Sequence, residues 1–142
     1  MSQVKEIIQD RELFAVQEGQ CVAEVARRMA ELKVGAILVL RQGELRGVFS
    51  ERDLMVRVVL AGLDPAATPV EQVMSTEITT VSETATPEDA MESMRAHNCR
   101  HLPVLRDSTV VAFLSMRDLM NYELARKTEE LDHMKAYIHG AA

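Results

Sequence analysis

Two copies of a Ser-x-Arg-Asp motif carry the side chains best suited to chemistry in this sequence, Ser50 to Asp53 and Ser115 to Asp118. A serine followed three residues later by an acid predicts a capping box, which stabilises a helix start by about 1 kcal/mol. The same helix start can bind a phosphate through its free N–H groups, while the carboxylate accepts ribose hydroxyls and the arginine pairs with phosphate charge. The motif alone fits a cap, and the combination of all three side chains favours a nucleotide.

The motif occurs twice because the chain contains an internal duplication. Residues 13–55 align with residues 78–120 at a constant offset of 65 without a gap, and eleven of the aligned pairs are identical. Both copies end in Ser-x-Arg-Asp-Leu-Met. Two similar units that pack together form a molecule with pseudo-twofold symmetry, so we expect the motif at two related positions.

Each copy predicts the same order of elements, β-α-β-β-α. Runs of β-branched and apolar residues predict strands, and apolar residues at helical spacing predict helices. The first helix of the second copy has a natural start, with Thr86 as N-cap, Pro87 at the first helical position and Asp89 as the capping-box acid. In the first copy the expected strands are 13–16, 36–40 and 46–49 and the helices are 22–32 and 51–62; in the second copy the strands are 78–81, 101–105 and 110–114, and the helices begin at 87 and 116.

Composition and charge limit the functions that the chain can have. Its 142 residues are 47% hydrophobic and carry a net charge of −6, which suits one compact core or two merged half-cores. The negative charge argues against a binder of nucleic acid or of anionic membranes, because both need a basic face. No apolar run is long enough to span a membrane, and the N-terminus does not resemble a signal peptide. Cys21 and Cys99 are expected as reduced thiols, which is typical of a cytoplasmic protein.

The duplicated order of elements, with Leu102-Pro103-Val104 and the run from Gly47 to Asp53, resembles a pair of cystathionine-β-synthase (CBS) domains, also called a Bateman module. The resemblance covers about residues 7–124 and implies an α+β fold of two pseudo-twofold-related repeats packed together, followed by a C-terminal helix. The chain departs from the pattern at two places. Residues 36–39 lack the proline of 101–104, and repeat two has Ala112 where repeat one has Gly47. The single module, 1–142, is expected to divide into repeat one at 7–62, a linker at 63–72, repeat two at 73–124 and a C-terminal helix at 125–142.

The resemblance implies adenosine-containing ligands, AMP, ADP, ATP or NAD(H), in clefts between the copies. Each cleft would combine the Ser-x-x-Asp motif of one copy with the first strand and the helix-to-strand loop of the other. Cleft one would contain Ser50, Arg52, Asp53, Thr79, Cys99, Arg100, His101 and Pro103. Cleft two would contain Phe14, Lys33, Val34, Gly35, Ala36, Ser115, Arg117 and Asp118. Cleft one gathers more cationic groups, so we expect unequal ligands or affinities, although Arg100 and His101 also fit a solvated loop.

Catalysis finds little support in the sequence. No nucleophile is placed beside a base, no glycine-rich loop of the Walker or Rossmann type occurs, and the histidines lack a second ligand at metal spacing. Asp10, Glu18 and Glu83 are expected as solvated charges. We therefore expect no enzyme activity, no catalytic cofactor and no metal. Two function classes remain: a regulatory module that reports nucleotide occupancy to an effector protein by conformational change, and a dimerisation scaffold whose motifs are only helix caps.

The residues after the second copy predict a helix from Asn121 to about Ile138. Leu124, Leu131 and Ile138 recur every seven residues, and Lys127 interrupts the stripe. Such a stripe is typical either of a last helix packed on its own subunit or of a helix–helix contact in a homodimer. Paired CBS domains often form flat dimers, so the resemblance implies a homodimer.

Overall fold

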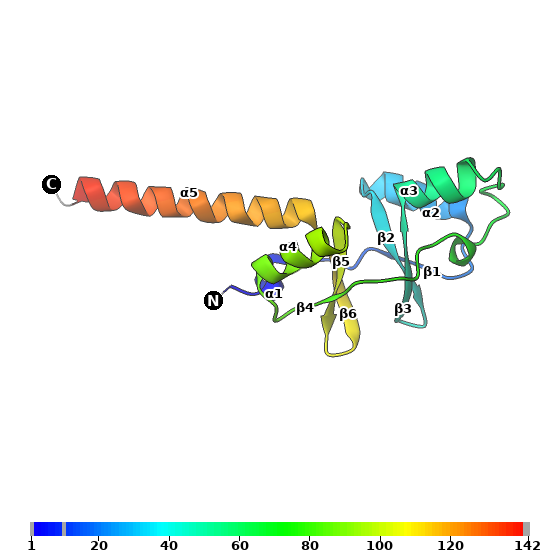
Figure 1. Ribbon diagram of the computed structural model, residues 1–142, viewed down its shortest axis with the longest axis horizontal. Helices are drawn as coiled ribbons and strands as arrows, with labels where there is room; N and C mark the ends of the chain where they lie inside the picture. The colour runs from blue at the N-terminus through cyan, green and yellow to red at the C-terminus, as the bar shows by residue number, and fades with distance from the viewer. Residues whose placement is uncertain (1, 10, 141–142) are drawn as a thin grey trace.

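The computed structural model describes residues 2–9 and 11–140 and contains two three-stranded sheets of the same design. In each sheet a short first strand runs parallel to the second, which forms an antiparallel hairpin with the third. Figure 1 shows the two hairpins side by side and pointing in the same direction. The strands are β1 (Ala15–Gln17), β2 (Ala36–Arg41) and β3 (Glu44–Ser50) in one sheet, and β4 (Val81–Ser82), β5 (His101–Arg106) and β6 (Thr109–Ser115) in the other. The duplicated α+β fold is thereby confirmed.

The hairpin strands lie close to their expected ends, whereas both first strands are shifted toward the C-terminus. β1 begins at Ala15 and β4 at Val81, rather than at 13 and 78. Leu13 packs in the apolar layer between the sheets instead, and Val81 is the first residue of its segment to pair with β5, opposite Val104. A strand end depends on where a ladder partner begins, and the pattern of a single segment does not contain that information.

Two helices per repeat pack on the sheets. α2 (Val22–Leu32) and α4 (Pro87–Ala96) follow the first strands, and the expected capping box at Thr86 is present, with the Asp89 N–H donating to Thr86 Oγ1 at 3.1 Å. After β3, α3 (Glu51–Asp53) runs directly into a π-helical segment, η1 (Leu54–Val59). Gly62, with φ +71°, follows its end. The connection to repeat two contains a short 3₁₀ helix, η2 (Val70–Gln72).

The second helix of repeat two and the C-terminal helix form one continuous element, α5 (Met116–Gly140). Residues 141 and 142 of the expected C-terminal helix lie outside the described residues. Figure 1 shows α5 projecting far beyond the sheets, and Leu124, Leu131 and Ile138 are exposed on it. None of the described helices combines the length and apolar character needed to cross a bilayer.

Three apolar clusters hold the fold together. One lies under the helices of repeat one, one under those of repeat two, and a third, containing Leu38, Leu40 and Val110, lies between the sheets. An N-terminal helix that the sequence pattern did not predict, α1 (Val4–Ile7), joins the cluster of repeat two. Val4 is fully buried there, and its N–H donates to the Ala85 carbonyl at 2.8 Å. The N-terminal segment therefore packs on repeat two before the chain enters the first sheet.

Two of the three carboxylates expected as solvated charges are in fact paired. Glu18 accepts from Arg46 at 3.3 Å, and Glu83 accepts from Arg106 at 2.9 Å. Both carboxylate side chains are largely covered, at 17% and 15% exposure. That expectation was wrong for Glu18 and Glu83 because the arginine partners lie on strands far away in sequence; Asp10 lies outside the described residues.

Candidate functional site

The first Ser-x-Arg-Asp motif forms a complete capping box. Asp53 Oδ2 accepts the backbone N–H of Ser50 at 3.0 Å and the Ser50 hydroxyl at 3.0 Å. The Asp53 N–H in turn donates to Ser50 Oγ at 3.1 Å. Asp53 is only 7% exposed, so its carboxylate stabilises the start of α3 from an almost buried position.

The second motif repeats this geometry in a more open setting. The Ser115 N–H donates to Asp118 Oδ2 at 2.8 Å, and the Asp118 N–H donates to Ser115 Oγ at 3.1 Å. The Asp118 side chain is 17% exposed, against 10% for the Asp53 side chain. Both motifs are thus helix caps, as the capping interpretation predicted, and a capping carboxylate still has lone pairs left for a ligand.

The two helix starts have little free N–H capacity for a phosphate. The Glu51 N–H donates to the Gly35 carbonyl at 2.9 Å, and the Met116 N–H donates to the Arg100 carbonyl at 2.8 Å. Each helix-to-strand loop therefore hydrogen bonds to the helix start of its own repeat. Within the described residues, the N–H groups of Arg52 and Arg117 make no hydrogen bond and are the ones left for a ligand.

The segment that leads into each first strand crosses to the carboxylate of the opposite repeat. Ser75, before β4, donates its hydroxyl to Asp53 Oδ1 at 3.2 Å and lies 3.4 Å from Oδ2. Arg11, before β1, pairs with Asp118 Oδ2 at 2.7 Å. The two crossings lie in corresponding segments of the two repeats, and each places an Asp of one repeat against the lead-in segment of the other.

Each carboxylate has one cation, but from a different source. In repeat one Arg57, one turn further along the same helix, lies 3.6 Å from Asp53 Oδ1 and donates to the carbonyls of Val73 at 3.3 Å and Met74 at 2.9 Å. The offset of 65 places Tyr122 at the equivalent position in repeat two. Arg11 supplies the missing charge there.

The pKa values of Asp118 and His101 have different causes. His101 begins β5 opposite Ser115, and Asp118 lies in the first turn of α5. Burial raises the pKa of Asp118, but hydrogen bonds from Arg11 and Ser115 and the charge of Arg11 outweigh it, so the pKa lies below its usual range. Burial lowers the pKa of His101, against the charges of Asp118 and Glu51. The lowered pKa favours the neutral form of the His101 ring. Its ring centroid lies 5.0 Å from that of Phe113.

The other residues expected in cleft one surround the end of β5. Pro103 is buried opposite Phe113 in the hairpin, and the half-buried Cys99 packs against the core of repeat two, where burial raises the thiol pKa. Arg52 and Arg100 are exposed and Thr79 is half-buried. Within the described residues, no hydrogen bond or ion pair joins these side chains to Ser50 or Asp53.

The residues expected in cleft two lie in two groups. Lys33 is an exposed C-cap with φ 57°, Val34 packs on the core of repeat one, and Gly35 faces the Glu51 carboxylate. Ala36 is buried opposite Ser50, whereas Phe14 is half-buried and Arg117 is exposed. Of these residues, within the part of the chain that the structure describes, only Ser115 and Asp118 are joined by hydrogen bonds. Asp118 has a partner in the other repeat, Arg11, which the prediction omitted.

Sequence reasoning missed Arg11, Ser75 and Arg57. Arg57 could have been found, because an arginine four residues after an aspartate lies on the same helix face. Ser75 and Arg11 precede their strands in segments without periodicity, and no sequence signal places them beside the opposite repeat.

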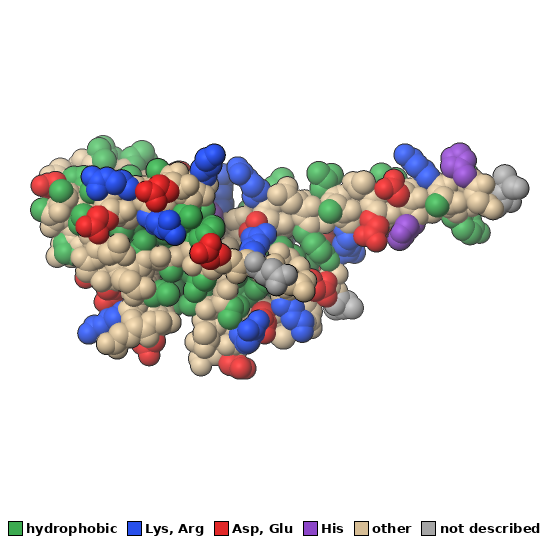
Figure 2. Space-filling view, turned by 180° about the vertical axis from the view of Figure 1, so that it is seen from behind, with side chains coloured by type: hydrophobic (Ala, Val, Ile, Leu, Met, Phe, Trp, Pro, Cys, Tyr) green, Lys and Arg blue, Asp and Glu red, His purple; other side chains and the backbone are tan. Residues whose placement is uncertain are grey.

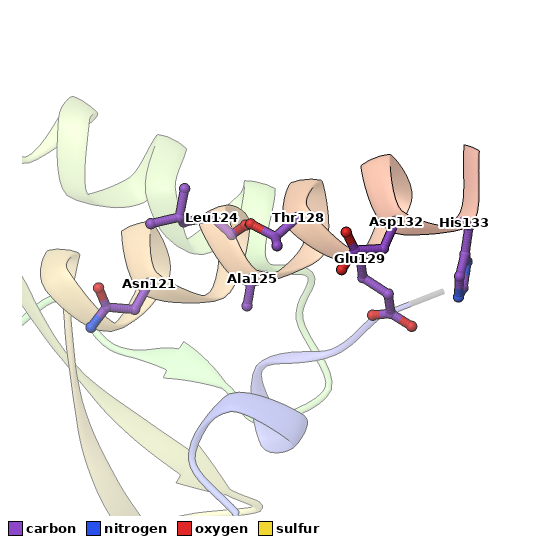
Figure 3. A pocket seen from close by; sticks show the side chains of 7 residues that line it. All are labelled: Asn121, Leu124, Ala125, Thr128, Glu129, Asp132 and His133. Atoms are coloured by element: carbon purple, nitrogen blue, oxygen red, sulfur yellow. The ribbon is translucent and has the colours of Figure 1, made fainter. Parts of the chain in front are cut away.

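Shallow hollows occur along α5. One is lined by Asn121, Leu124, Ala125, Thr128, Glu129, Asp132 and His133, all on this helix (Figure 3). Figure 3 shows side chains spaced along one open helical surface, not groups converging on a common point. In the described residues, His, Cys, Asp and Glu side chains form no cluster that could hold a metal ion.

Two segments of the chain, residues 4–59 and 70–125, match the family model of the CBS domain. The CBS domain-containing protein YhcV of Bacillus subtilis is 33% identical over 128 residues, covering 90% of each chain. The crystal structure of the CBS domain NE2398 matches with a TM-score of 0.82 at 30% identity, covering 87% of this chain and 98% of that one. The CBS domain protein PAE2072 of Pyrobaculum aerophilum, complexed with AMP, matches with a TM-score of 0.71 at 30% identity and covers 82% of this chain and 89% of its own. The two matched segments correspond to the two repeats with their capped Ser-x-Arg-Asp motifs, and the chain therefore belongs to the CBS domain family, of which it contains a pair.

Proposed function

We propose that the protein binds adenine nucleotides, AMP, ADP, ATP or NAD(H), in the two clefts between its CBS repeats and signals their presence to a partner by conformational change. The observation that carries this proposal is the crossing of the lead-in segments, which brings Ser75 to Asp53 and Arg11 to Asp118. A ligand bound to either carboxylate would touch both repeats at once. The AMP complex of the related PAE2072 protein supports the choice of an adenine nucleotide.

The proposed recognition follows from the groups at each motif. The carboxylate accepts the two ribose hydroxyls, while the remaining helix N–H and the motif arginine, Arg52 or Arg117, bind phosphate. The neutral His101 ring can donate or accept one hydrogen bond at the edge of cleft one. This set of groups binds and orients a ligand, and we infer a regulatory rather than a catalytic role.

Occupancy would be transmitted by the angle between the repeats. The layer between the sheets contains few buried side chains, Leu38, Leu40 and Val110, so the interface is small compared with the two repeat cores. A ligand that binds one relative orientation more tightly shifts the population toward it. We propose that the signal passes to an effector protein and that the module acts as a homodimer.

The homodimer proposal is supported by exposed apolar side chains on the two second helices. Met55, Val59 and Leu60 on and after η1 are between 53% and 74% exposed. On α5 the exposed apolar residues are Met120, Leu124, Leu131, Met134, Tyr137 and Ile138. Figure 2 shows such side chains along the projecting arm among charged ones. A second copy of the chain would cover both surfaces.

A scaffold function is the second candidate, and one observation favours it. Asp53 already accepts hydrogen bonds from the Ser50 N–H, the Ser50 hydroxyl and Ser75, so its cap is satisfied without a ligand. In that case the motifs would only stabilise helix starts.

Thermal shift with AMP, ATP, NADH and GMP as the guanine control separates the two candidates. A ligand present at 100 times its dissociation constant stabilises the folded state by about 2.7 kcal/mol, which raises the melting temperature. We expect a shift with at least one adenine ligand and a smaller one with GMP. No shift with any adenine ligand at millimolar concentration would leave the scaffold function.

A further inference from the structure

Arg11 provides the cation of the second motif from outside that motif. Its guanidinium lies 2.7 Å from Asp118 Oδ2, and the side chain is 36% exposed. Upstream, the chain is fixed to repeat two by the buried Val4 and Ile8. Arg11 is thus held near Asp118 by its neighbours, yet its own side chain reaches solvent and can reorient.

Arg11 occupies an oxygen that a ribose would need. Asp118 Oδ2 already accepts the Ser115 N–H at 2.8 Å as well as Arg11. Within the described residues Oδ1 makes no hydrogen bond, so one of the two oxygens is open and the other is shared. Two vicinal hydroxyls bind a carboxylate best when each carboxylate oxygen accepts one of them. The ribose hydroxyls therefore compete with the Arg11 guanidinium for Oδ2.

A nucleotide resolves this competition with its own phosphate. Its ribose satisfies Asp118, and its phosphate at the helix start offers Arg11 a replacement anion with charge-assisted hydrogen bonds. A nucleoside without phosphate takes the carboxylate but leaves Arg11 without a partner.

Resting on the proposed function, we propose that Arg11 is a phosphate-binding and specificity-determining residue of cleft two, which exchanges Asp118 for the phosphate when a nucleotide binds. Cleft one has no such exchange. Arg57 there is held by the carbonyls of Val73 and Met74, and the lead-in segment offers Asp53 only the neutral hydroxyl of Ser75. Binding in cleft two therefore depends more on the ligand's phosphate than binding in cleft one.

Calorimetric titration of Arg11→Gln with adenosine and with AMP tests the exchange through the sign of two effects. Removing the competing cation frees Asp118, so adenosine should bind up to about fivefold more tightly, the range of an exposed ion pair. Removing the Arg11 guanidinium, the partner of the phosphate, should lower the affinity for AMP about tenfold, the range of a charge-assisted hydrogen bond. Arg28→Gln is the matched control, because Arg28 forms an exposed pair with Glu31 on α2 away from the motifs.

The same titrations in an Asp118→Asn background assign the effect to cleft two, since the gain for adenosine requires the Asp118 charge and should disappear. Suppose that AMP binds the parent protein but that Arg11→Gln changes the affinities for adenosine and AMP in the same direction, or changes neither. The exchange is then refuted, and nucleotide binding stands. If neither ligand binds the parent protein, the proposed function fails and this inference fails with it.

Discussion

At the scale of single residues, the two aspartates share a motif and differ in environment. Asp53 is almost buried and accepts from Ser50 and Ser75, with Arg57 beside it. Asp118 is more open and is paired with Arg11. We therefore expect the same substitution to have different effects at Asp53 and at Asp118, although the two motifs are alike.

Asp53→Ala should destabilise the protein more than Asp118→Ala. The first substitution removes the cap and leaves several donors unpaired in a buried place, which costs about 2–3 kcal/mol. The second removes a less buried cap and a partly exposed ion pair, which costs about 1 kcal/mol. Urea denaturation measures both values, and equal losses would show that the difference in burial has no energetic consequence.

Titration of His101 should make the protein less stable as the pH falls below about 6.5, the ordinary histidine value. Burial lowers the pKa of His101 in the folded state, so the unfolded chain takes up the proton first and is favoured. The folded state keeps its full stability above the pKa that His101 has in the unfolded chain. It loses stability as the pH falls from there through the pKa of His101 in the folded state.

Denaturation of the parent and of His101→Phe between pH 7.5 and about 5.5 checks this sign. The parent should lose stability over this window, and the variant should lose less. A parent whose stability rises as the pH falls would contradict the direction of the pKa change.

At the scale of elements, β3 packs tightly at Gly47 against the segment that leads into β4. A Cβ added there would overlap the side chain of Met74, which is itself buried. Met74 also bonds to Arg57 through its carbonyl and precedes Ser75. Packing at Gly47 therefore sets the position of the groups beside Asp53. Repeat two has Ala112 at this position.

Gly47→Ala should cost about 1–3 kcal/mol, the range for added volume in a packed core. Met74→Ala alone should also destabilise, but it makes room for the new methyl group. The double variant should therefore be more stable than the sum of the two single losses predicts, in urea melts analysed as a mutant cycle. Strict additivity would show that Met74 is not what excludes a side chain at Gly47.

The order of elements could be predicted from sequence, whereas the cross-repeat contacts could not. Capping at Thr86 and Asp89 and the hairpins follow from local residue types, because caps and turns depend on near neighbours. Arg11 and Ser75 act on side chains of the opposite repeat, and α1 is held by tertiary burial of Val4. Such contacts depend on packing between distant segments, and the duplication showed only which positions are equivalent.

At the scale of the whole molecule, α5 has more apolar surface than its own chain covers. Its exposed stripe recurs every seven residues at Leu124, Leu131 and Ile138. An isolated projecting helix is marginal in water without a partner. The proposed homodimer would cover the stripe and give the nucleotide clefts control over the angle between subunits.

Leu131→Asp combined with Ile138→Asp should weaken the dimer and leave nucleotide binding in place. Ala125→Asp with Ala136→Asp is the matched control, since it adds the same charge to exposed positions outside the stripe. Light scattering at tens of micromolar should detect a dimer for the parent and control and a smaller species for the stripe variant. A monomeric parent, with and without nucleotide, would exclude the homodimer.

The proposed function requires the carboxylates of the two capped motifs to bind an adenine nucleotide between the repeats. AMP is therefore titrated by calorimetry into the parent and into the double variant Asp53→Asn with Asp118→Asn, because asparagine keeps the size of each cap and removes its charge. We predict saturable binding in the parent and a loss of at least tenfold in affinity in a double variant that remains folded by circular dichroism. Equal AMP affinity in both proteins, or no binding to the parent at millimolar AMP, would contradict the claim.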